Sequence, residues 1–189
     1  MVMAMAQPAR MTAREFLVAK ASDPQRFHQL IDGVVVSSQP RPRHQDAVFE
    51  IAFRLRLWTD ETGLGKMSLP LDIALDGNNV YAPDVLWAAD HRRFEADNLF
   101  DGMPDLIVEV RSPSTWIYDV GPKKNLYEKH GLPELWLVDT FGERVLVFRR
   151  SAAGTAEFDV GIELAADDTL TSPLLPGFAL PLRELFPAD

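Results

Sequence analysis

The stretch from residue 42 to residue 63 constrains the fold most, because it has the pattern of one long amphipathic helix. Its apolar residues recur at the three- and four-residue spacing of a single buried stripe: Ala47, Val48, Ile51, Ala52, Leu55 and Trp58. Gly63 supplies the stop signal. Three mainly apolar segments, 67–75, 80–88 and 105–111, follow with the composition of strands. This order predicts helices packed on a mixed β-sheet.

Local signals on both sides of this core complete the predicted order of elements. Thr12 and Glu15 form a capping-box pattern, and Asp119, Pro122 and Gly131 supply a cap, a first turn and a stop for a second helix. The predicted elements are helices at 12–20, 119–130 and 182–186, a turn or short helix at 23–30, and strands at 34–36, 135–139, 144–148 and 156–164. The expected fold class is α/β (α+β), a mixed sheet flanked by helices.

Composition bounds the size, the compartment and the partners. The 189 residues suit about one domain, so we expect residues 1–10 to form a flexible tail and residues 11–189 a single domain. The absence of cysteine excludes disulfides and thiolate sites and fits a reducing cytoplasm, and the apolar runs are too short for a membrane span. The net charge of -9 disfavours a broad phosphate-binding surface, although a bound cation would reverse the charge of an acidic site.

Two carboxylates stand inside the apolar strand segments. Glu109 interrupts the run 106–110, and Asp84 lies within 81–87. A buried charge without a partner costs several kcal/mol, so each acid needs one. Two acids on neighbouring strands can share a hard cation that prefers oxygen ligands. The structural alternative is that each pairs with a buried arginine or lysine, and Arg111 lies close by; the residues alone leave both interpretations open.

These acids belong to a longer pattern. Pro83-Asp84 is followed after 24 intervening residues by Glu109 and then by a basic residue, which resembles the PD-(D/E)XK nuclease superfamily. The segment 102–115 is a more specific signal and is similar to the Uma-2 family of restriction-endonuclease-like proteins. Further matching positions are 30–33, His44, Asp119, Lys123, Tyr127, Gly131 and 133–139. The resemblance covers roughly residues 11 to 150 and implies that family's αβββαβ core.

The resemblance also implies an activity and a set of roles. The protein would be a metal-dependent endonuclease that hydrolyses DNA phosphodiester bonds. Asp84 and Glu109 would hold Mg²⁺ or Mn²⁺, and the backbone carbonyl of Val110 would complete the protein's ligands. The superfamily places a lysine two residues after the glutamate, where this chain has Arg111. Lys123 is the expected replacement in the cationic role, and Arg111 is a second candidate, although a guanidinium is a poor general base.

Three accessory positions and one departure from the family pattern qualify this expectation. His44 would orient a phosphate or a water, or cap its helix, and Tyr127 would pack under Lys123 or bond to the site. Gln29 stands where the family usually has a glutamate. The alternative is therefore a catalytically weakened or inactive nuclease-fold protein that acts as a binding or regulatory module. Cleavage of both DNA strands would need two sites, so we also expect a homodimer.

Overall fold

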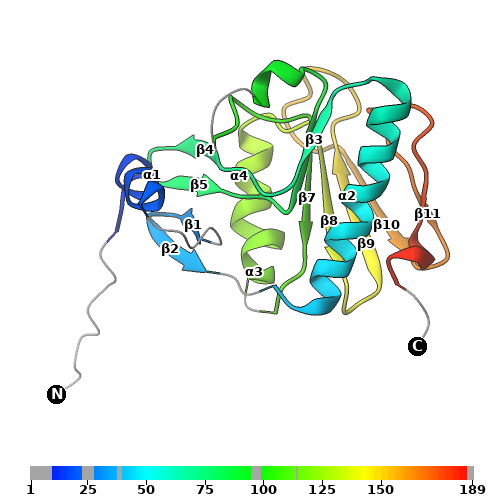
Figure 1. Ribbon diagram of the computed structural model, residues 1–189, viewed down its shortest axis with the longest axis horizontal. Coiled ribbons are helices and arrows are strands. Elements are labelled where there is room, and N and C mark those ends of the chain that lie inside the picture. Colours follow the sequence, from blue (N-terminus) through cyan, green and yellow to red (C-terminus); the bar gives the residue numbers. More distant parts are fainter. Residues whose placement is uncertain (1–9, 23–27, 38–39, 95–98, 114, 187–189) are drawn as a thin grey trace.

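The computed structural model describes residues 10–22, 28–37, 40–94, 99–113 and 115–186 (Figure 1). The predicted tail, residues 1–10, lies outside this part of the chain except for Arg10. The helical elements are α1 (Ala13–Ala21), α2 (Pro42–Thr62), η1 (His91–Phe94), α3 (Trp116–Tyr118), η2 (Asp119–Lys123), α4 (Lys124–Lys129) and η3 (Leu182–Glu184). Among the described residues, no helix is long and apolar enough to cross a membrane.

A six-stranded sheet forms the centre of the fold. Its order is β10-β9-β8-β7-β6-β3, and every neighbouring pair is antiparallel except β7 and β8. Its strands are β3 (Lys66–Ser68), β6 (Val85–Ala88), β7 (Leu106–Val110), β8 (Glu134–Asp139), β9 (Arg144–Arg149) and β10 (Val160–Ala165). The one parallel pair arises because α3, η2 and α4 connect β7 to β8, as a crossover between parallel strands requires. The predicted fold class is confirmed.

A second, four-stranded antiparallel sheet lies beside the first and has the order β2-β1-β5-β4 (Figure 1). Its strands are β1 (His28–Ile31), β2 (Val34–Ser37), β4 (Ile73–Asp76) and β5 (Asn79–Tyr81), and a two-stranded pair is formed by β11 (Thr169–Leu170) and β12 (Leu180–Pro181). The sequence prediction of a turn or short helix at 23–30 is wrong for residues 28–30, which belong to β1. The rest of that segment, 23–27, lies outside the described residues.

The two faces of the six-stranded sheet bury different helices. On β7, Leu106, Val108 and Val110 point into the cluster that contains the apolar stripe of α2, whereas Ile107 points into the cluster that contains Tyr127 of α4. Figure 1 shows α2 and α4 on opposite sides of β7. Because successive side chains alternate between faces, Glu109 shares the α4 face with Ile107.

Prolines correct two of the predicted strands. The segment 67–75 is divided into β3 and β4 around Pro70, and 80–88 is divided into β5 and β6 around Pro83. Proline lacks the N–H that a ladder needs, so each segment leaves one sheet and enters the other at its proline. Asp84 consequently lies just before β6, in the break, rather than inside a continuous strand.

Candidate functional site

A buried ion-pair network surrounds Glu109 near the end of β7. The Lys123 Nζ lies 2.6 Å from Glu109 Oε1, and the Tyr127 hydroxyl donates a hydrogen bond to the same oxygen at 2.7 Å. Lys123 also contacts Asp119 Oδ1 at 2.9 Å. The side chains of Lys123, Glu109 and Asp119 are only 2–4% exposed. The Lys123 ammonium therefore pairs with two buried carboxylates. Glu109 thus has the basic partner that the structural alternative predicts for it.

The helical segment between β7 and β8, formed by α3, η2 and α4, positions Lys123. It begins at Trp116, three residues before the predicted start, so Asp119 lies inside it and is not the predicted cap. Asp119 and Lys123 are separated by one helical turn and belong to the π-helical segment η2, where the backbone of Gly121 departs from helical dihedrals (φ -116°, ψ -105°). Both side chains point inward and bond to each other, which explains why Asp119 is not available as a cap.

Burial dominates the electrostatics of the network. It raises the pKa of Glu109 and of Asp119, and Lys123 only partly offsets that effect. Burial acts in the opposite direction on Lys123, but the two carboxylates outweigh it and keep its pKa above the ordinary lysine value. Burial and the adjacent Glu109 raise the pKa of Tyr127, so its hydroxyl remains a proton donor. Because its pKa stays above the ordinary lysine value, Lys123 remains positively charged.

Asp84 and His44 form the outer part of the same region. The backbone N–H of Val110 donates to Asp84 Oδ2 at 2.7 Å, which ties the break before β6 to the end of β7. His44 Nδ1 lies 3.1 Å from the carbonyl oxygen of Val110, and its Nε2 lies 3.4 Å from Asp84 Oδ1. A carbonyl can only accept, so Nδ1 carries the proton. Burial lowers the pKa of His44, but Asp84 outweighs that effect and raises it overall.

His44 does not cap its helix, which corrects that alternative. α2 begins with Pro42 after Arg41, and the side chain of Arg41 makes no capping hydrogen bond there. The imidazole instead reaches across to the sheet. The imidazole therefore lies between the Val110 carbonyl and Asp84 Oδ1 and bridges the end of β7 to the break before β6.

The remaining candidates lie in different places. The Arg111 guanidinium bonds to Asp139 Oδ1 at 2.7 Å and lies over the ring of Phe141, so it is held at the β8–β9 turn rather than at Glu109. Gln29 Oε1 accepts a hydrogen bond at 3.2 Å from the backbone N–H of Ala82, two residues before Asp84. The structure therefore groups Asp84, Glu109, Val110, Lys123, His44 and Tyr127, places Gln29 at their edge and directs Arg111 elsewhere.

Asp119 also belongs to this group through its contact with Lys123, and sequence reasoning gave it the wrong role. It was expected to cap a helix, but it shares Lys123 with Glu109. The spacing of Asp119 and Lys123, four residues apart on a predicted helix, was a signal that could have indicated their pairing.

The donor chemistry of the group suits a hard divalent cation. Asp84, Glu109 and the Val110 carbonyl offer oxygen atoms, the ligands that Mg²⁺ and Mn²⁺ prefer. Among the described residues, however, no three acidic or imidazole side chains lie together as a ready-made metal cluster. Water and the backbone carbonyl would complete the coordination, as is usual for Mg²⁺.

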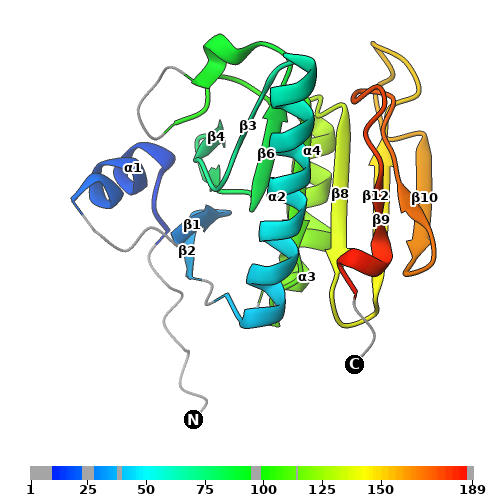
Figure 2. The same ribbon diagram turned by 45° about the vertical axis from the view of Figure 1, so that its right-hand side comes forward.

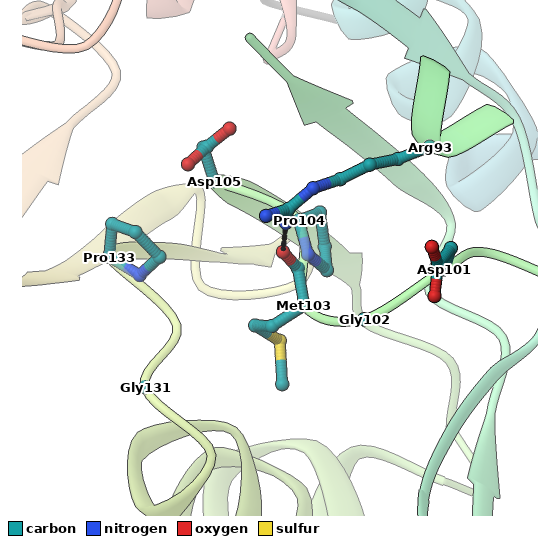
Figure 3. A pocket seen from close by; sticks show the side chains of 8 residues that line it. All are labelled: Arg93, Asp101, Gly102, Met103, Pro104, Asp105, Gly131 and Pro133. Carbon is teal, nitrogen blue, oxygen red and sulfur yellow. Dashed lines mark hydrogen bonds between the residues drawn. The ribbon is translucent and has the colours of Figure 1, made fainter. Parts of the chain in front are cut away.

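Two cavities differ in their relation to this group. A groove of about 610 Å³ runs along α2 and reaches His44 and Asp84, which gives this side of the group an opening to the surface. A pocket of about 410 Å³ lies instead at the start of β7, beside Asp105 (Figure 3). Arg93 crosses it and donates to the carbonyl oxygen of Met103 at 2.6 Å. Only the groove along α2 adjoins the candidate site.

Comparison with known proteins identifies the family of this chain. Residues 13–183 match the Uma2 family, described as "Putative restriction endonuclease". The chain belongs to the Uma2 family. A solved structure titled as a "putative nuclease belonging to DUF820" from Anabaena variabilis ATCC 29413 has a TM-score of 0.76 and 20% sequence identity, and the match covers 93% of this chain and 97% of that one. This likeness confirms the fold of the Uma2 chain. A search of curated proteins returned no match.

Proposed function

We propose that this Uma2-family chain is a metal-dependent endonuclease that hydrolyses phosphodiester bonds of DNA. The observation that carries the proposal is that Asp84 and Val110 lie together at the end of β7, joined by the Val110 N–H···Asp84 hydrogen bond and bridged by His44, next to the buried Lys123–Glu109 pair. The family match and the nuclease title of the similar structure agree with it. The lack of cysteine suits a cytoplasmic enzyme of this kind.

Asp84, Glu109 and the carbonyl of Val110 would hold the metal. When bound, Mg²⁺ or Mn²⁺ would polarise the phosphate and lower the pKa of a coordinated water. The three donors come from the end of β7 and the break before β6, and the Val110 N–H···Asp84 bond fixes these two segments relative to each other.

Lys123 and its neighbours supply the remaining chemistry. Lys123 carries a positive charge that would stabilise the negative charge developing on the phosphate, and its bonds to Asp119 and Glu109 orient it before substrate arrives. Tyr127 holds Glu109 from the other side. His44 lies beside the groove and Asp84, where it would release Asp84 and then contact a phosphate or a water.

The test compares wild type with Asp84→Asn. Asparagine keeps an oxygen that can accept the N–H of Val110 but loses the charge that a metal needs. Calorimetric titration of Mg²⁺ and Mn²⁺ and nicking of plasmid DNA would be measured on the same samples, with Glu163→Gln, a surface acid paired with Arg144, as the matched control. We expect metal binding and nicking in the wild type and the control and neither in Asp84→Asn. Nicking that survives in Asp84→Asn contradicts the proposal.

A second candidate function is a nuclease fold that binds without cutting. Two observations favour it: Gln29 presents an amide where the resemblance implies an acid, and Arg111 is bonded to Asp139 and so does not replace the missing lysine. A chain of this kind would bind metal or DNA but leave the plasmid intact. The same titration and nicking assay therefore separates the two candidates.

A further inference from the structure

The solvent-facing side of α2 carries an unusual stripe of residues. At about 100° per residue, Asp46, Phe49, Phe53 and Arg56 fall within roughly 80° of arc on the helix. The buried stripe that contains Ile51 lies on the opposite side. Figure 2 shows this helix along the front of the molecule.

The centre of the stripe is apolar and open. Phe49 is 69% exposed and Phe53 is 46% exposed, and their rings stack in parallel with centroids 6.1 Å apart. Leu69, which is 51% exposed, joins both rings along the groove beside the helix. A contiguous apolar surface of this kind commonly marks an interaction site.

The charges at the two ends of the stripe indicate what covers it. From Asp46 to Arg56, the stripe has the order acid, phenylalanine, phenylalanine, base. In an antiparallel copy the order is reversed, so an acid on one helix faces a base on the other. If a second copy of α2 packs antiparallel on this exposed side, with the twofold axis crossing at the level of residue 51 along the helix, Phe49 meets the partner subunit's Phe53. The same operation places Asp46 opposite the partner subunit's Arg56. A twofold contact repeats each pair, so Asp46 faces the partner subunit's Arg56 and Arg56 faces the partner subunit's Asp46.

We propose that this stripe is the contact surface of a homodimer in which two α2 helices pack antiparallel. The inference depends on charge order and exposed rings, and it is independent of the proposed nuclease activity. Antiparallel packing also places the two helix dipoles favourably. Arg56 would then lie between its own Asp60, 2.8 Å away, and the partner subunit's Asp46. Phe49, Phe53 and Arg56 also line the groove that reaches Asp84, so the contact would cover part of that groove, and dimer formation would set the relation between two candidate sites.

A charge-exchange experiment tests the register. Asp46→Arg alone places two arginines opposite each other at both ends of the contact, and Arg56→Asp alone places two aspartates there. We expect each single variant to weaken dimerisation about tenfold or more, since favourable surface pairs become repulsive. An equimolar mixture of the two variants restores both pairs, so it should form a heterodimer with wild-type affinity.

Masses would be measured by sedimentation equilibrium on the full chain, with circular dichroism to verify folding. The wild type should approach about 42 kDa, twice the 21.2 kDa of one chain. Phe49→Glu should abolish the dimer, whereas Val18→Glu on α1, where Val18 is also 69% exposed, should not. A monomeric wild type overturns the proposal. A wild-type dimer that survives Phe49→Glu, or a mixture that stays monomeric, also overturns it because the contact then lies elsewhere or has another register.

Discussion

Lys123→Met tests whether the ammonium holds two buried carboxylates in the core. Methionine keeps most of the apolar length of lysine but leaves Glu109 and Asp119, previously 2.6 and 2.9 Å from Nζ, without their cation. Removing one partner of a buried ion pair costs about 3–5 kcal/mol. Because two acids lose their cation here, we expect the upper part of that range at pH 8.

A loss of this size is large for such a chain. Domains have total stabilities of about 5–15 kcal/mol, and 1 kcal/mol changes the melting temperature by roughly 2–4 °C at this length. The melting temperature of Lys123→Met should therefore fall by roughly 8–20 °C. Urea unfolding followed by tryptophan fluorescence would give the free energy, and Lys129→Met, an exposed lysine on α4, is the matched control.

The pH dependence of this loss provides a second measurement. Burial already raises the pKa of Glu109 and Asp119, and the loss of Lys123 removes the charge that opposes it. For an acid with a raised folded pKa, stability is present below the unfolded pKa and is lost as pH rises through the folded value. The cost of Lys123→Met should therefore shrink from pH 8 towards pH 5. A cost below about 1 kcal/mol at pH 8, well under the range for a buried pair, or an equal cost at both pH values, would refute the argument.

Three further perturbations have defined outcomes. Burial opposes ionisation of Asp139, but the N–H of Gly142, Arg111 and the N–H of Phe141 outweigh it and lower its pKa; Asp139→Asn should cost about 1–3 kcal/mol in urea unfolding at pH 7, and the difference should disappear in acid as pH falls through the lowered pKa. Burial raises the pKa of Glu134, although the hydrogen bonds from Trp136 and Ser172 oppose that rise. The stability that protonated Glu134 contributes is therefore lost as pH rises above about 4.5, and the melting temperature of Glu134→Gln should lack this part of the pH dependence. If the proposed metal site is correct, Gln29→Glu should tighten Mn²⁺ binding in calorimetry about tenfold, because a carboxylate is a better ligand for a hard cation than an amide.

The elements that the sequence predicted well are those whose signals are local. The apolar stripe of α2, its stop at Gly63 and the capping box at Thr12 need only the spacing of neighbouring residues, and all three are confirmed. The divided strands were missed because apolar composition continues through Pro70 and Pro83. Composition indicated strand there, but the missing proline N–H decides where each segment changes sheets.

The candidate site was predictable only in part for a similar reason. The lone acid in the run 106–110 identified Glu109 as a residue that needs a partner, and alternation on β7 places it towards α4. Which base pairs with Glu109 depends on the length and direction of the helical connection between β7 and β8, and tertiary packing determines both. Arg111, the nearest base in sequence, turns to Asp139, while Lys123, fourteen residues away from Glu109, makes the pair. The contacts of His44 with Val110 and Asp84 have no local signal at all.

The ion pair between Lys123 and Glu109 serves both interpretations of the site, so Asp84 is the residue that distinguishes them. Burying Glu109 requires a cation whether or not the chain cuts DNA, and loss of Lys123 will damage the fold in either case. Asp84 has a different position: its side chain is 19% exposed, it borders the groove, and its bond from Val110 tolerates an amide. A structural role for Asp84, as the charged partner of His44, predicts that Asp84→Asn changes stability without a consequence for metal. A ligand role predicts the reverse, a nearly unchanged melting temperature with metal binding lost, and the two can be measured on the same sample.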